Sequence, residues 1–200
     1  MEIVDAEHPI EASRARRLKA ATQEAHERLD TRIMAANPFK SHARYGLFVK
    51  VQHRFHREID ALYSHPVLEA VLPDLAGRRR LDTIERDLAD LGVSPPNGVG
   101  TASVFDTRAD VPTAFGWLYV AEGSNLGAAF LLKAARQLGL SEGFGARHLA
   151  GHPDGRGLHW RTFVSALDSL ELDPAEEDRV VDGAHGAFGY VHAVVEEEFS

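Results

Sequence analysis

Apolar residues recur at helical spacing along most of the chain, and no segment alternates with the period of two typical of a half-buried strand. The pattern therefore predicts an all-α protein with a single multi-helix domain over residues 12–200, preceded by a flexible tail over residues 1–11. Helices are expected over 13–36, 42–64, 66–73, 81–92, 112–133, 160–167 and 174–200, with long loops at 92–110 and 139–157.

Two helix starts carry specific capping signals. Ser41 precedes the second helix and offers a hydroxyl to its unpaired amides. Asp173, Pro174 and Glu176 combine a capping acid, a first-turn proline and an acid three residues on, which predicts the start of the last helix.

The stretch over residues 113–133 is the least ordinary of the predicted helices. It contains Gly116, Gly123 and Gly127, and each glycine costs a helix interior roughly 0.5–1 kcal/mol relative to alanine. Because Gly123 and Gly127 are four residues apart, they leave one bare patch on one face. On the glycines alone a close helix crossing is the commoner explanation, and the alternative is a surface on which a flat ligand lies. Glu122 interrupts the apolar run and argues against a membrane span.

Composition excludes several classes of function. The net charge of −8 makes nucleic acid an unfavourable partner. The absence of cysteine excludes disulfides, iron–sulfur clusters and thiolate metal sites, and it fits a cytoplasmic protein. The first seven residues are acidic, so we expect neither a signal peptide nor a membrane anchor.

Among 11 histidines, His26 has the most informative neighbours. Asp30 lies one turn later and can accept a hydrogen bond from Nδ1, leaving Nε2 for a metal. Lys19 is seven residues earlier, on the same face, where it can hold an anionic group. We expect most of the others to lie in tails, loops or at the surface, among them His8, His148, His152 and His159.

A second polar group lies on the predicted helix over 42–64. Gln52 and His56 are four residues apart and share a face, close to His53. They form either a network that positions water near a reaction centre or a solvated helix edge, and taken alone the solvated edge is the commoner case.

The histidine spacing discriminates between metal chemistries. No glutamate lies three residues before any histidine, so the Glu-x-x-His pairs of ferritin-like di-iron sites are missing. The His-Glu-x-x-His motif of zinc hydrolases is missing too. Haem fits best, because one imidazole suffices as axial ligand and the opposite face can stay open.

The sequence resembles the bacterial biliverdin-producing haem oxygenases from about residue 14 to residue 199. Three stretches carry the resemblance: LKAATQEAHERL over 18–29, GWLYVAEGSNLGAAF over 116–130 and FGARHL over 144–149. It implies haem b between a proximal helix and a glycine-kinked distal helix.

The resemblance also implies roles for single residues. The family's proximal histidine corresponds to His26, and its acidic partner is usually glutamate, so the shorter Asp30 is expected to make a longer or water-mediated contact. The distal glycines correspond to Gly123 and Gly127, and Ser124 takes the place of an aspartate in the animal enzymes. Further implied roles are propionate binding by Lys19 and Tyr119, water binding by Asn125, Gln52 and His56, and haem packing by Phe188.

The activity implied is oxidative cleavage of haem by O2 to biliverdin, ferrous iron and carbon monoxide. Since the chain shows no flavin or nicotinamide motif, electrons must come from a separate ferredoxin or flavodoxin-type system. A bilin-using photoreceptor is one conceivable consumer of the product. The alternative hypotheses are a haem carrier or sensor on the same fold, and an all-α protein without a cofactor.

The resemblance also bears on which meso carbon is attacked. Some related enzymes turn the haem in its plane with two lysines whose places here hold Met34 and Ala134. Lys133 lies about 100° around the helix from Ala134 and is not expected to replace such a lysine. We therefore expect the ordinary haem orientation, held by Lys19 and Tyr119, and biliverdin IXα as the main product.

Overall fold

The computed structural model describes residues 13–96, 105–106 and 108–200, so the predicted tail lies outside the described residues. Within that part the chain is all-α, as predicted, and pairs in β fashion only at isolated bridges near Ser141. The helices are α1 (Arg14–Ala35), α2 (His42–Glu58), α3 (Pro66–Val71), α4 (Leu81–Asp90), α5 (Val111–Gln137), α6 (Arg156–Asp168) and α7 (Pro174–Glu198). Three short 3-10 segments connect them: η1 (Asp60–Ser64), η2 (Ala76–Arg78) and η3 (Arg147–Leu149).

The predicted capping signals are confirmed. The Ser41 side chain accepts from the amide of Arg44, and Asp173 and Glu176 form a reciprocal capping box at the start of α7. The second helix ends earlier than expected, at Glu58, and continues to residue 64 only as the 3-10 segment η1.

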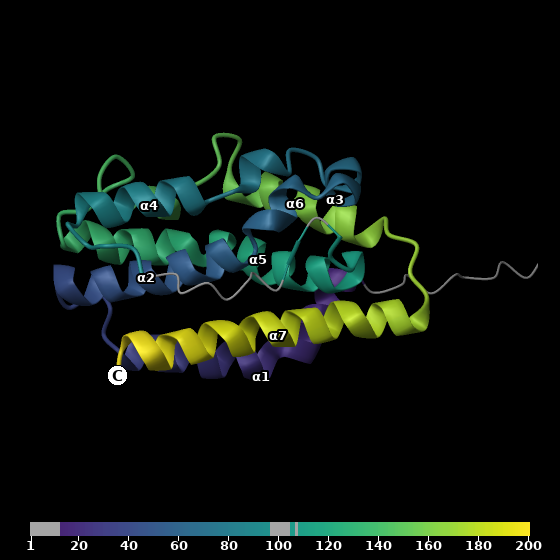
Figure 1. The fold of residues 1–200 in the computed structure, drawn as a ribbon, viewed down its shortest axis with the longest axis horizontal. Helices are drawn as coiled ribbons and strands as arrows, with labels where there is room; N and C mark the ends of the chain where they lie inside the picture. Colours follow the sequence, from purple (N-terminus) through teal and green to yellow (C-terminus); the bar gives the residue numbers. More distant parts are fainter. Residues whose placement is uncertain (1–12, 97–104, 107) are drawn as a thin grey trace, which may run out of the picture.

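The helices pack around α5, which runs through the middle of the molecule (Figure 1). Helix α7 lies against both α5 and α1, while α2, α4 and α6 cover other parts of the core. Five apolar residues that recur at helical spacing along α7 are buried: Val180, Ala184, Phe188, Val191 and Val195. No helix in the described part is both long and apolar enough to cross a membrane.

Gly116 explains how closely α5 approaches α7. A Cβ atom at Gly116 would lie 2.2 Å from the carbonyl oxygen of Val180, and one at Gly183 would lie 2.4 Å from that of Thr113. Two glycines thus face each other's backbones. The close crossing that small residues predict is confirmed here, at the N-terminal half of α5.

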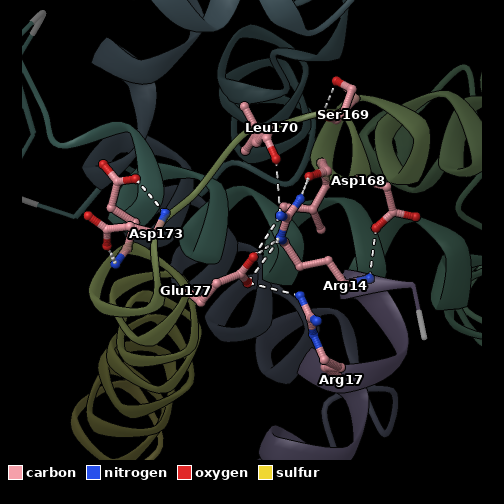
Figure 2. Close-up of polar contacts among 10 residues, drawn as sticks. Arg14, Arg17, Asp168, Ser169, Leu170, Asp173 and Glu177 are labelled. Carbon is pink, nitrogen blue, oxygen red and sulfur yellow. Dashed lines mark hydrogen bonds and ion pairs between the residues drawn. The ribbon is translucent and has the colours of Figure 1, made fainter. Parts of the chain in front are cut away.

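The start of α1 is fastened to α7 and to the end of α6, as Figure 2 shows. The Arg14 guanidinium donates to the carboxylate of Glu177 at 2.6–3.0 Å and to the carbonyl oxygen of Leu170, while its amide donates to Asp168 at 2.7 Å. Arg17 adds a second cation, and the hydrogen bonds from Arg14 hold the pKa of Glu177 below its usual range. These contacts set the rotation of α1 and so the direction in which its side chains point.

Candidate functional site

The C-terminal half of α5 differs from the half that crosses α7. Among the described residues, a Cβ atom added to Gly123 or Gly127 would meet no atom within 4 Å apart from its own stretch of helix, so the patch is open on that side. Leu126 and Phe130 lie on the same side, and the Phe130 side chain is 83% exposed. The helix assignment continues unbroken from Val111 to Gln137, and the kink expected at the glycines stays a prediction.

His26 on α1 is exposed and already oriented. Its Nδ1 lies 3.3 Å from Oδ2 of Asp30, a direct contact despite the shorter acid. The ring of Phe188 on α7 stands edge-on to the imidazole, with centroids 5.8 Å apart. An imidazole that faces a carboxylate through one nitrogen offers the other to a metal, with its ring direction set.

Tyr119 of α5 forms a contact with α1. It is half-buried on α5, where burial raises its pKa and a hydrogen bond with Thr22 of α1 opposes that rise. Thr22 lies one turn after Lys19, which is exposed and forms no ion pair with any described residue. The hydroxyl of Tyr119 therefore lies against α1, about one turn along that helix from Lys19.

The second polar group is not a solvated edge. His53 and His56 are buried on α2, and Gln52 is half-buried beside them. Burial lowers the pKa of His56 to about 3, with further lowering by His148, Arg80 and His53, and its Nδ1 has no hydrogen-bond partner. His56 is therefore a neutral imidazole with an unused ring nitrogen.

Asn125 and Ser124 occupy different environments although they are adjacent. Asn125 is buried, and its side-chain amide nitrogen has no partner among the described residues. Its backbone carbonyl oxygen accepts from Arg156 at 2.6 Å. Ser124 is exposed and donates to the carbonyl oxygen of Ala121 at 2.8 Å. Asn125 is thus available to hold water inside the protein, while the Ser124 hydroxyl is satisfied by its own helix.

A buried ion pair lies behind the glycine patch. The sequence pattern did not predict this pair. Arg78 donates to Glu122 at 2.8 Å, with both side chains 1% exposed, and Nδ1 of His159 lies 3.3 Å from the same carboxylate. The one signal available was the acid itself, because a glutamate within an apolar helix needs a partner. Its partner is 44 residues earlier, in η2, where no spacing rule points to it.

A cavity of about 10 Å³ adjoins this ion pair, lined by Arg80, Glu122, Asn125, Leu126, His152, Arg156, His159 and Trp160. Arg80 Nε, Glu122 Oε1 and Asn125 Nδ2 are all buried without hydrogen-bond partners. Because the cavity has room for about one water molecule and polar groups surround it, it is suited to an ordered water.

Two histidines expected at the surface are buried instead. His148 lies in η3 with Nδ1 2.7 Å from Oδ2 of Asp87, and His159 lies on α6 beside Glu122. Each is buried because a carboxylate from a distant segment pairs with it. His152 is half-buried, and His8 lies outside the described residues.

Comparisons with known proteins agree with one another. Residues 12–197 match the family model described as "Heme oxygenase". "Heme oxygenase PigA" from Pseudomonas aeruginosa is 41% identical over 187 residues, which is 94% of this chain and 93% of that protein. The NO- and CO-bound haem oxygenase from Neisseria meningitidis is 42% identical with a TM-score of 0.86, covering 94% of this chain and 92% of that one. The haem oxygenase from Leptospira interrogans shares the fold at 19% identity, with a TM-score of 0.73 over 93% of this chain and 100% of that one.

Proposed function

The chain belongs to the haem oxygenase family, and from that premise we propose that α1 and the C-terminal half of α5 are the two walls of its haem site. The enzyme oxidises haem with O2 and an external reductant. His26 would bind the iron from the α1 side, and Gly123 and Gly127 would face the opposite side of the ring. Phe188 would pack beside His26, and Ser124 would border the ring from α5.

One observation carries this proposal: an oriented imidazole and a bare helix face occur in the same fold. Asp30 contacts Nδ1 of His26 and leaves Nε2 for a metal. A Cβ atom at Gly123 or Gly127 would project into open space, which a flat ligand can occupy instead. Bound haem supplies an iron that binds and activates O2. With no side chain between ring and backbone, the α5 backbone would lie directly against the haem and would shape the space open to O2.

The buried polar atoms behind α5 support a route for protons. Arg80, Glu122 and Asn125 surround the water-sized cavity, and His56 and Gln52 lie on α2, with Arg80 close enough to His56 to lower its pKa. We infer that Asn125, Gln52 and His56 hold ordered water that supplies protons to the reaction. His56 stays neutral at physiological pH and can both accept and donate.

Aerobic turnover of the haem complex with product analysis tests the activity directly. An oxygenase loses its Soret band and gains biliverdin absorbance, whereas a carrier or sensor keeps the Soret band. The variant His26→Ala is expected to lose the native ferric spectrum and the turnover. A variant that kept both would remove His26 from the site.

We propose biliverdin IXα as the main product, because Lys19 and Tyr119, which contacts α1 at Thr22 one turn from Lys19, would hold the haem propionates at one end of the site. The two places where lysines would turn the haem hold Met34, which is 57% exposed, and Ala134. Chromatography against the four biliverdin isomers decides the question, and mainly β or δ isomer would contradict the proposal. The combined variant Met34→Lys, Ala134→Lys, Lys19→Asn is expected to shift the product away from α.

We propose that electrons come from a ferredoxin or flavodoxin-type donor in the cytoplasm. We also propose that the reaction serves either iron acquisition or the supply of bilin to a photoreceptor. The sequence supports a separate donor, because it shows no flavin or nicotinamide motif. Comparing turnover supported by purified ferredoxin and its reductase with turnover supported by flavodoxin identifies the donor class. The absence of turnover with both donor proteins would contradict the proposal.

A further inference from the structure

A group of metal-ligating side chains lies outside the two walls assigned to haem. Asp74, His152 and His159 each offer one ligand atom, and these atoms all lie within 4.8 Å of one another. We propose that the three residues bind a divalent first-row transition metal ion. Two imidazoles and one carboxylate match the ligand preference of Fe²⁺, Co²⁺ and Zn²⁺ better than that of Mg²⁺ or Ca²⁺.

His159 is the fixed member of the group. Its Nδ1 lies 3.3 Å from Oε2 of Glu122, and the whole residue is only 8% exposed. Its Nε2 is buried and has no hydrogen-bond partner in the described part of the chain. A carboxylate behind one imidazole nitrogen, with the other nitrogen unused, is the arrangement that supports metal-binding histidines. Since an unpaired buried polar atom is costly, a ligand for Nε2 would relieve that cost.

His152 and Asp74 are the adjustable members. Nε2 of His152 lies 3.8 Å from Oδ2 of Asp74, and the His152 ring stacks on that of His159 with centroids 4.5 Å apart. Two ligands of one tetrahedral ion are separated by roughly 3.4 Å, so binding needs a small inward movement and a turn of the His152 ring. Both residues lie outside the α-helices with partly or fully exposed side chains, whereas His159 is held within α6.

Neighbouring cations set the expected strength of the site. Arg78 is neutralised by Glu122, but Arg80 and Arg156 line the adjoining cavity together with both histidines. Their positive charges oppose a bound cation, so we expect a site that binds and releases its ion readily. Imidazole-binding metals are favoured further, because neutral nitrogen ligands depend less on charge attraction than carboxylates do.

The position of the site points to a source for the ion. Glu122, which backs His159, immediately precedes Gly123 on α5. Haem cleavage releases ferrous iron beside this helix, and Fe²⁺ belongs to the class of ions that the three residues would bind. This link rests on the proposed function, whereas the metal site itself rests only on the three side chains and Glu122.

Titration of the haem-free protein with Co²⁺ tests the site without any turnover. The visible Co²⁺ spectrum reports imidazole and carboxylate ligation, and histidine ring ¹⁵N shifts on Zn²⁺ addition show which residues bind. We expect one equivalent to bind with shifts at His152 and His159, and at least tenfold weaker binding in His152→Ala and Asp74→Asn. Asparagine suits position 74, where φ is +54°. His185→Ala, which removes an exposed histidine of α7, serves as the matched control.

Binding that is equal in wild type and His152→Ala, or ¹⁵N shifts confined to other histidines, would overturn the metal site. A second measurement addresses the link to iron, namely the rate at which a colorimetric chelator captures Fe²⁺ after a single turnover. Capture should be faster in Asp74→Asn than in wild type, at equal bilin yield, and equal rates would overturn that link. Failure to form bilin would count against the proposed function and leave the Co²⁺ result unaffected.

Discussion

The two halves of α5 use the same residue type for opposite purposes. In the half that ends at Glu122, Gly116 lets the backbones of α5 and α7 touch, and any side chain there would meet backbone atoms. In the half that begins at Gly123, the glycines have nothing opposite them. A glycine in a helix therefore marks either a contact already made or space kept for a ligand, and only its surroundings tell which.

The largest effect is expected from Gly116→Ala. Its Cβ would lie 2.2 Å from the carbonyl oxygen of Val180 and 2.6 Å from the amide nitrogen of Ala184, and these backbone atoms cannot turn aside. We expect the free energy of unfolding to fall by about 3 kcal/mol, at the upper end of ordinary overpacking. Urea unfolding measures this, and an unchanged midpoint would show that the helices can separate at little cost.

Gly127→Leu should leave the fold intact and impair the reaction. The side chain would extend into the open space against which we place the haem, so bilin yield per haem should fall by about tenfold or more. Ala129→Leu is the matched control, because Ala129 is exposed on the same helix, about 200° around the axis from Gly127. Wild-type yield from Gly127→Leu would place the haem elsewhere.

Buried His56 should make the free energy of unfolding depend on pH in the acid range. Burial lowers the pKa of His56 from 6.5 to about 3, so the unfolded chain takes up a proton at a higher pH than the folded one does. Stability contributed by neutral His56 is therefore complete above pH 6.5 and is lost progressively as the pH falls toward 3. In His56→Gln this part of the pH dependence should disappear. Parallel stability curves for variant and wild type between pH 6.5 and 4 would show that His56 is not buried as a neutral group.

The smallest effect has the opposite sign to the first. Gly127→Ala adds a methyl group that touches nothing and removes the entropy penalty of glycine, so stability should rise by roughly 0.5–1 kcal/mol. Thermal unfolding of haem-free protein measures the change. A loss of stability would mean that the space beyond Gly127 is occupied in the free protein.

The sequence predicted what depends on local rules. Helix spacing, the cap at Ser41 and the capping box at Asp173 arise from residues close together in the chain, and each was found as expected. His26 and Asp30 were predictable for the same reason, because an i, i+4 pair on a helix is a local contact.

The remainder depends on contacts between distant segments. His148 and His159 appear exposed in the sequence, yet Asp87 and Glu122 bury them through pairs that no spacing rule reveals. The different roles of Gly116 and Gly127 were equally hidden, because only the position of α7 separates a helix crossing from an open face.

A crystal structure of the ferric haem complex would locate the haem relative to α1 and α5. We expect Nε2 of His26 to bond to the iron, Nδ1 to keep its contact with Asp30, and the ring to lie against Gly123 and Gly127. Iron bonded to any other residue, or haem on another face of the molecule, would contradict the proposed haem site.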